Sequence, residues 1–489
     1  MSILAIDAGT TGVTALLVDT SAQVISRGYL EFEQSYPADG WVEHDPEQIW
    51  QATLGAVAQA IAGQAPPTAL GITNQRETIA LWDRVTLRSI RPAIVWQDRR
   101  SADICKRLTA AGHGSRVTQL SGLRLDPYFS ATKLMWLAEN EPEVWAEVCA
   151  GRTAIGTIDS YLVARLTAGA ANVTDASNAS RTMLFDLHRG QWSEELCQLF
   201  GVPISALPKV VPSWGIAAQT DPGAFLGLDL PIAGIAGDQQ AALFGQRCFS
   251  AGASKCTYGT GSFVLVNTGA VPAPATEGLL TTIAWRAPDG TDTFALEGAV
   301  FVTGAAVQWL RDGLEVIGSA AETAELASSV KDSGGVVFVP ALTGLGAPHW
   351  DPHARGLIIG LQRGTTRAHL VRATLEGIAF EVRDIVDLMI KDAGVELPEL
   401  AIDGGAAAND FLCQLQATAL QVSVARSTDA EATGIGAALL AGLGIGIWDE
   451  LSDIPAATRT VFDPGARDDL HYAKWREAVR RSLAWAESE

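Results

Sequence analysis

Two turns rich in glycine and threonine could bind an anion such as a phosphate. The first turn spans residues 7–12 and the second residues 259–261. In such turns successive backbone N–H groups point into one hollow, and glycine lets the backbone approach an oxygen closely. A single turn of this kind is also typical of an ordinary hairpin. A pair of them, with a third glycine-rich turn at 403–409, favours a nucleotide held between two related parts of the chain.

Two aspartates stand where acid–base or metal chemistry could occur. Asp7 ends an apolar segment at the first turn, a position that suits Mg²⁺ held through water, although it could instead accept hydrogen bonds from the turn itself. Asp238 lies between an apolar segment and a helix, where a general base and a helix N-cap are equally expected.

A donor and an acceptor follow another apolar segment at Arg76 and Glu77. An arginine fork and a carboxylate could together bind the hydroxyls of a polyol, although a surface ion pair is the alternative. Three aromatic residues, Trp96, Tyr128 and Phe263, could line the carbon face of a small substrate, or could simply belong to the core.

Other phosphate-binding and nucleophile motifs are missing from the sequence. No lysine follows a glycine, so the chain has no Walker A motif, and it has neither G-x-G-x-x-G nor G-x-S-x-G. The two hairpin turns therefore remain the best candidates for a nucleotide site.

The elements that must position these residues alternate between strand and helix. Apolar and β-branched runs predict four strands, at residues 2–6, 13–18, 23–32 and 70–73. A helix is predicted to begin at Pro46, with Asp45 as its cap and Gln48 as a capping-box partner. This order predicts an α/β fold with a mixed sheet.

A second strand–turn–strand segment at 255–266 resembles the first, about half a chain away, which suggests duplication. We therefore expect two domains, residues 1–249 and 250–489. The apolar stretch 433–448 is too short to span a membrane and is predicted to be a buried helix.

Composition limits the possible partners and the compartment. The 489 residues include 35 Lys plus Arg and 55 Asp plus Glu, which gives a net charge of −20. Such an acidic chain lacks the basic surface of a nucleic-acid binder. Its six cysteines show no metal-binding spacing, and no signal peptide is apparent, so we expect a reduced, cytoplasmic protein without a membrane span.

Several segments resemble the FGGY family of carbohydrate kinases, and within it the members that act on glycerol. They lie at residues 40–46, 72–78, 93–100, 126–130, 178–183, 234–245 and 344–356. The resemblance runs nearly end to end. It implies two actin-like (ribonuclease H-like) domains with mixed sheets flanked by helices, closing on Mg²⁺-ATP and glycerol, with formation of sn-glycerol 3-phosphate.

The resemblance also implies roles for individual residues. It gives Asp238 the role of general base. Matching the family's glycerol-binding positions are Arg76, Glu77, Trp96, Tyr128, Asp238, Gln239 and Phe263. Matching its nucleotide-binding positions are Thr10, Thr11, Gly12, Thr260, Gly304, Gln308, Gly405 and Asn409. Asp7 is the residue expected to hold Mg²⁺, through water.

Two other functions remain open from the sequence. The chain could phosphorylate another polyol or a ketose such as xylulose, or it could be an actin-like ATPase in which closure controls partner binding. The Arg76–Glu77 pair favours a polyol kinase over the ATPase. A homo-oligomer, either a dimer or a tetramer, is also expected.

Overall fold

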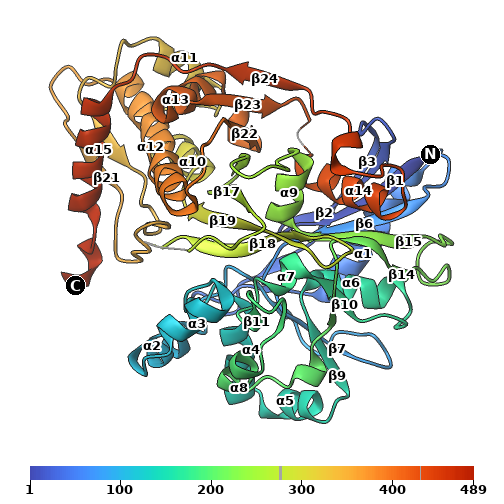
Figure 1. Cartoon of the computed structure of the whole chain (residues 1–489). Coiled ribbons are helices and arrows are strands. Elements are labelled where there is room, and N and C mark those ends of the chain that lie inside the picture. The colour runs from blue at the N-terminus through green and yellow to red at the C-terminus, as the bar shows by residue number, and fades with distance from the viewer. Residues whose placement is uncertain (275–277, 430, 489) are drawn as a thin grey trace.

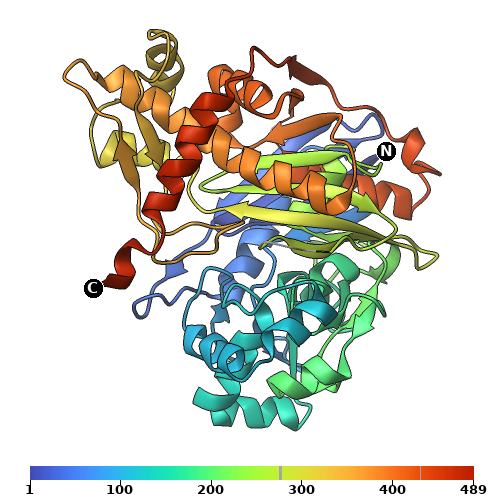
Figure 2. The same cartoon turned by 60° about the vertical axis from the view of Figure 1, so that its left-hand side comes forward.

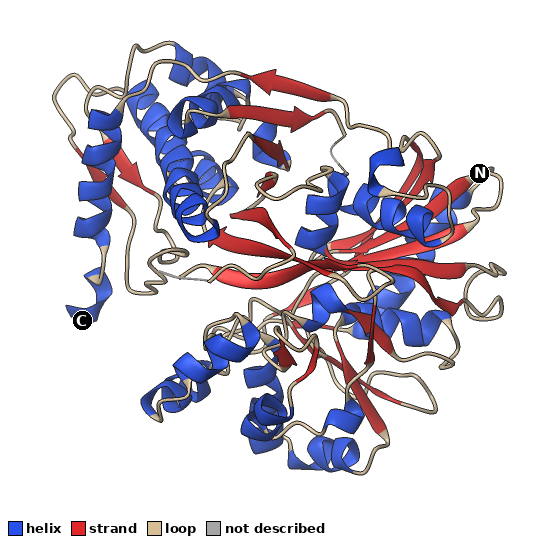
Figure 3. Cartoon of the chain, viewed as in Figure 1, coloured by secondary structure: helices blue, strands red, loops and turns tan. Residues whose placement is uncertain are grey.

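The computed structural model describes residues 1–274, 278–429 and 431–488. Two large mixed sheets form the centre of the molecule, with helices on either side of the strands (Figure 1, Figure 3). The α/β class expected from the sequence is therefore confirmed.

The first sheet has the strand order β14-β15-β6-β1-β2-β3. Its strands are β1 (Ser2–Ala8), β2 (Gly12–Asp19), β3 (Val24–Glu31), β6 (Ala69–Asn74), β14 (Trp214–Gln219) and β15 (Pro231–Gly237). β1 runs antiparallel to β2 and parallel to β6, which in turn is parallel to β15. The carboxyl ends of β1, β6 and β15 consequently meet at one edge of the sheet.

The second sheet has the order β18-β19-β17-β16-β22-β23-β24. Its strands are β16 (Ser254–Tyr258), β17 (Ser262–Gly269), β18 (Leu280–Arg286), β19 (Asp292–Val300), β22 (Glu399–Asp403), β23 (Ser423–Ser427) and β24 (Arg459–Phe462). β16 is antiparallel to β17 and parallel to β22, as β1 is to β2 and β6. Both hairpins expected from the sequence are present.

Strand β1 is an apolar run because both faces of the first sheet are covered. Leu4 and Ile6 pack in the cluster that contains α1 (Pro46–Ile61), whereas Ile3 and Ala5 pack in the cluster that contains α14 (Ala432–Gly444). The predicted buried helix near the carboxyl end is thus α14. None of the described helices is long and apolar enough to cross a membrane.

Helix α14 packs directly against the backbone of its neighbours because glycines lie at the points of contact. A Cβ at Gly71 would lie 2.1 Å from the Ala437 oxygen, and one at Gly436 would lie 1.9 Å from the Ala241 oxygen of α9 (Asp238–Gly245). Both contacts are far below van der Waals distance. α9 and α14 therefore lie side by side in the middle of the molecule (Figure 1).

The start of α1 differs in one detail from the prediction. Asp45 caps the helix by accepting from the Glu47 N–H, as expected. Gln48, however, accepts from the backbone N–H of Glu33 instead of closing a capping box. The chain entering from β3 lies close enough to α1 to compete for this side chain.

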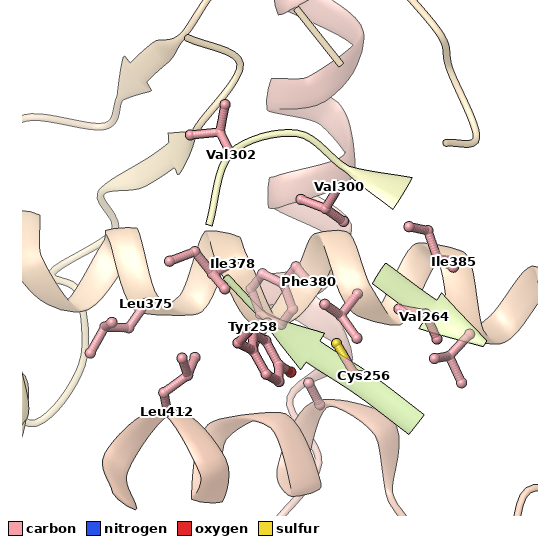
Figure 4. Close-up of a cluster of buried hydrophobic side chains, with 14 of the residues drawn as sticks. Cys256, Tyr258, Val264, Val300, Val302, Leu375, Ile378, Phe380, Ile385 and Leu412 are labelled. Carbon is pink, nitrogen blue, oxygen red and sulfur yellow. The ribbon is translucent and has the colours of Figure 1, made fainter. Parts of the chain in front are cut away.

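The core of the carboxyl-terminal half lies between the second sheet and α12 (Arg367–Ala393), which crosses one face of that sheet (Figure 2). Cys256 and Val264 of the sheet contribute to the same buried cluster as Ile378 and Ile385 of α12 (Figure 4). α13 (Asp410–Leu420) adds Leu412 from another side. This core includes Tyr258, the residue just before the second glycine-rich turn, and so fixes the base of that hairpin.

The remaining elements connect and flank the two sheets. The helices are α2 (Ala102–Ala110), α3 (Gly114–Ser121), α4 (Ser130–Asn140), α5 (Pro142–Cys149), α6 (Ile158–Leu166), α7 (Ala176–Ala179), α8 (Glu194–Phe200), α10 (Gly304–Asp312), α11 (Glu322–Ser328) and α15 (Asp469–Ser482). The short strands are β4 (Gln34–Ser35), β5 (Glu43–His44), β7 (Ala80–Asp83), β8 (Ala93–Ile94), β9 (Thr153–Gly156), β10 (Val173–Asp175), β11 (Phe185–Asp186), β12 (Gln191–Trp192), β13 (Lys209–Val211), β20 (Val337–Val339) and β21 (Leu357–Ile359). Helices α2–α8 form a lobe below the first sheet in Figure 1.

Candidate active site

The edge of the first sheet at which its parallel strands end carries four of the candidate site residues. Asp7 lies near the end of β1, Arg76 and Glu77 follow β6, and Asp238 follows β15 as the first residue of α9. Parallel strands of α/β sheets commonly place ligand-binding residues at this edge. The fold thus brings together residues that lie more than 200 positions apart.

Arg76 and Glu77 are buried, so the surface ion pair considered from the sequence is wrong. Arg76 is 2% exposed and Glu77 1%. The Arg76 Nε lies 3.1 Å from an Asp238 carboxylate oxygen, and its Nη2 donates to the Tyr128 hydroxyl at 3.2 Å. Arg76, Asp238 and Tyr128 therefore form one polar cluster.

The Arg76 side chain is also part of a buried ionic network that the sequence did not suggest. Glu297 of β19 pairs with Arg76 and with Arg181, and Arg181 in turn donates to Glu77 at 2.7 Å. A lone glutamate in the apolar segment 294–300 was the available sequence signal. Its two partners cannot be read from spacing because they come from distant parts of the chain.

The pKa values in this network follow from burial and from neighbouring charge. Burial raises the pKa of Asp238, and the Arg76 charge opposes that rise. Although burial alone would raise the pKa of Glu297, the charges of Arg181 and Arg76 hold it at about 2. Glu297 is therefore ionised throughout the physiological range, whereas the Asp238 carboxylate is a stronger base than an exposed aspartate.

Three aromatic rings form a wall beside this cluster. The ring centroids of Trp96 and Tyr128 lie 5.6 Å apart, those of Trp96 and Phe263 lie 6.3 Å apart, and both pairs meet edge to face. The Arg76 guanidinium lies 5.9 Å from the Phe263 centroid. All three candidate wall residues are consequently neighbours, although they come from distant segments.

Trp96 also connects the wall to the first glycine-rich turn. Its indole Nε1–H donates to the Thr10 hydroxyl at 3.0 Å. Because Phe263 lies two residues after Gly261, Trp96 lies between one residue of each phosphate-type hairpin. Thr11 is exposed, whereas Gly12 is buried at the start of β2, where a Cβ would lie 2.7 Å from the Leu30 oxygen.

The second hairpin packs against the start of α10. The Thr260 carbonyl accepts from the Thr303 and Ala305 N–H groups, and Gly304 donates to the Gly259 carbonyl at 3.0 Å. Gln308 is exposed one turn further along α10. The fold thus gathers Thr260, Gly304 and Gln308 around one hairpin tip.

The third glycine-rich turn borders the same hairpin. Gly404 has a φ of +90°, and a Cβ there would lie 2.4 Å from the Tyr258 oxygen. Gly405 is exposed at the start of a 3₁₀ turn, and Asn409 caps α13 by accepting from the Leu412 N–H. Gly405 and Asn409 therefore follow the strand that lies next to β16.

Asp7 has the chemistry of a cation ligand. Burial, reinforced by the negative charges of Asp238 and Glu431, raises the pKa of Asp7 to about 8. Carboxylates that repel one another in this way, here Asp7, Asp238 and Glu431, favour a divalent cation because its charge relieves the repulsion. Among the described residues no three His, Cys, Asp or Glu side chains group as a metal site, so the donor set fits a magnesium ion that keeps most of its water ligands.

Comparison with known proteins places the chain among carbohydrate kinases. The family model for the N-terminal domain of FGGY carbohydrate kinases matches residues 2–245, and the model for the C-terminal domain matches residues 254–445. A glycerol kinase from Halorhodospira halophila is 50% identical over 491 residues, covering 99% of this chain and 97% of its own.

Solved structures agree with this result. The crystal structure of Plasmodium falciparum glycerol kinase with ADP has a TM-score of 0.93 at 35% identity and covers 99% of this chain and 98% of its own. A xylulose kinase from Rhodospirillum rubrum, at 24% identity and a TM-score of 0.85, covers 98% of this chain and 97% of its own and shares the fold. The two mixed sheets with their helices are thus the actin-like fold that the resemblance implied, and the chain belongs to the FGGY family of carbohydrate kinases.

Proposed function

We propose that this protein transfers the γ-phosphoryl group of ATP to glycerol and releases sn-glycerol 3-phosphate. The observation that carries the proposal is the polar cluster of the buried Arg76 and Tyr128 with the partly exposed Asp238, beside the aromatic wall. It occurs in a chain that is about half identical to glycerol kinases over nearly its full length.

Glycerol is bound by the residues at the edge of the first sheet. Arg76 donates to its hydroxyls, Glu77 and Asp238 accept from them, and Gln239 contributes an amide from α9. Trp96, Tyr128 and Phe263 lie against the carbon chain. Such a pocket selects a short polyol because each buried polar group requires a hydroxyl partner.

Asp238 removes the proton from the attacking hydroxyl. Its raised pKa makes the carboxylate a better base, while the Arg76 charge at 3.1 Å keeps it ionised. The hydroxyl oxygen forms a bond to the γ-phosphorus as the bond from phosphorus to the bridging oxygen of ADP breaks. The abstracted proton remains on the Asp238 carboxyl until the products leave.

The glycine-rich turns bind the nucleotide. Backbone N–H groups of the turns around Thr10, Thr11, Gly12 and Thr260 contact the phosphates, and Gly304, Gln308, Gly405 and Asn409 line the remainder of the nucleotide site. Asp7 would hold Mg²⁺ through water, and a bound ion would supply neutralisation of the phosphate charge.

The molecular setting forms part of the same proposal. We assign residues 1–249 to an N-terminal domain with the glycerol site and the first phosphate hairpin. Residues 250–489 are assigned to a C-terminal domain with the second phosphate hairpin and the adenosine site, and the active site lies in the cleft between the two domains. The repeated strand plan of the two sheets supports this division. The protein is proposed to act in the cytoplasm, where ATP is available. It is also proposed to form a dimer or a tetramer, and light scattering after size-exclusion chromatography would distinguish the two.

A coupled assay for ADP release tests the function. With Mg²⁺-ATP, we expect turnover that depends on glycerol and is faster, by kcat/KM, than with xylulose or longer polyols. A well-folded protein with no glycerol-dependent turnover would contradict the proposal. Faster turnover of a ketose would favour the other member of the family, and glycerol-independent ATP hydrolysis would favour the ATPase.

A further inference from the structure

Glu297 is a charged residue in the middle of an otherwise apolar strand. It lies in β19, its side chain is fully buried, and Ala295 and Leu296 just before it belong to hydrophobic clusters. A buried carboxylate is costly unless it is paired and hydrogen-bonded, so its partners matter more than its charge alone.

Both carboxylate oxygens of Glu297 accept hydrogen bonds from arginines of the N-terminal half, Arg76 after β6 and Arg181 after α7. Oε2 accepts from the Arg76 Nη1 at 2.5 Å, and Oε1 accepts from the Arg76 Nη2 at 3.1 Å. Oε1 also accepts from the Arg181 Nη2 at 2.8 Å. A two-pronged contact of this kind fixes the plane of a guanidinium as well as its position.

The orientation of Arg76 decides which way its other donors point. With one edge of the fork held by Glu297, its Nε faces Asp238 at 3.1 Å and a second Nη2 proton faces the Tyr128 hydroxyl at 3.2 Å. The Arg76 Nη1 has a further acceptor in Gln240 at 3.3 Å. Glu297 therefore determines the direction in which the Nε and Nη2 donors of Arg76 point, toward Asp238 and Tyr128 of the proposed glycerol site.

The same face of the second sheet makes another contact with the proposed glycerol site, here called the acceptor site. In the strand register, Lys255 of β16 pairs with Leu265, and Leu265 pairs with Glu297, so the three side chains lie in one row. Lys255 is buried and donates to the Gln239 side chain and, at 3.0 Å, to the Thr257 hydroxyl. Two side chains in one row of this sheet, Glu297 and Lys255, thus bind two residues of the acceptor site, Arg76 and Gln239.

We propose that Glu297 is a positioning residue that orients Arg76 for polyol binding and ties the acceptor site to the sheet that carries the second hairpin. The inference rests on the proposed phosphorylation of glycerol. Arg181 completes the device because it bridges Glu297 and Glu77, so that both members of the Arg76–Glu77 pair are held by the same network.

Glu297→Gln tests this role because the amide has nearly the same shape as the carboxylate. Its NH₂ group cannot accept a hydrogen bond, so the arginine contacts to one of the two terminal atoms are lost. We expect the KM for glycerol to rise at least tenfold, while the KM for ATP at saturating glycerol stays within twofold. Calorimetry should show the same weakening of glycerol binding, since KM can differ from Kd. An unchanged glycerol affinity, or equal losses for both substrates, would overturn the proposal.

Glu376→Gln is the matched control. Glu376 is a buried glutamate of α12 that pairs with Arg372 at 2.9 Å, within the carboxyl-terminal half and away from Arg76. It should leave both KM values within twofold. A rise in the glycerol KM of this variant as large as that in Glu297→Gln would assign the effect to general destabilisation and overturn the inference.

Two milder variants keep the test decisive if Glu297→Gln does not fold. Glu297→Asp keeps the charge but shortens the reach, and Arg181→Lys keeps the charge but loses the fork. Each should raise the glycerol KM about three- to tenfold with little change for ATP, and unchanged glycerol KM values in both would refute the role. Absence of glycerol turnover in the unaltered protein would instead reject the proposed function itself.

Discussion

The two large sheets repeat one strand plan, yet the edges at which their central parallel strands end differ in character. β1, β6 and β15 take the places in the first sheet that β16, β22 and β23 take in the second, with the same parallel and antiparallel neighbours. After β6 the chain continues into Arg76 and Glu77, which are buried and charged.

At the matching place after β22 the chain continues into Gly404 and Gly405, without side chains and partly open to solvent. One edge is therefore built to bury polar side chains against a small substrate. The other presents backbone to a larger one. A repeated scaffold acquires different functions through the few residues that follow equivalent strands.

The largest effect is expected at the buried edge, from Asp238→Asn. The amide keeps the shape of the side chain but cannot accept the proton of the attacking hydroxyl. We expect kcat to fall by a factor on the order of 10² or more, with glycerol and ATP still bound. Coupled kinetics measure the first quantity and calorimetry the second, and a near-normal kcat would remove Asp238 from the role of base.

The pH dependence of kcat gives the next largest effect. Asp238 acts as a carboxylate, and burial raises its pKa above the ordinary value of 3.8, so activity falls as the pH drops through that raised pKa. Below it we expect about a tenfold loss of kcat per pH unit, measured where the protein stays folded. The same acid limb in the residual activity of Asp238→Asn would assign the limb to another group.

The hydrogen bond between the aromatic wall and the first glycine-rich turn should have a smaller effect. Trp96→Phe keeps an aromatic wall but removes the hydrogen bond to Thr10. The loss of such a bond costs about 0.5–1.5 kcal/mol, so we expect kcat/KM for ATP to fall roughly two- to tenfold. Thr10→Val removes the same bond from its other end, and a double variant with fully additive losses would show that the bond does not link wall and turn.

Much of this architecture could be predicted because it is local. The apolar strands, both hairpin turns and the α1 cap follow from residues that lie next to one another in the chain. The exposure of Arg76 and Glu77 could not be predicted in this way, since Glu297 lies 221 positions from Arg76. Gln48 shows the same limit on a smaller scale, because a neighbouring segment competes for a side chain whose local partner was evident.

The division of work between the two edges is tested most directly by measuring both KM values in one variant of each. Arg76→Lys loses the guanidinium fork at the buried edge, and Gly404→Ala forces a side chain into a backbone conformation with φ of +90° at the open one. We predict a glycerol KM at least tenfold higher with an ATP KM within twofold for Arg76→Lys. For Gly404→Ala, where the strain is about 1–3 kcal/mol, we predict an ATP KM at least tenfold higher with a glycerol KM within twofold. Equal increases of both KM values in either variant would contradict the account.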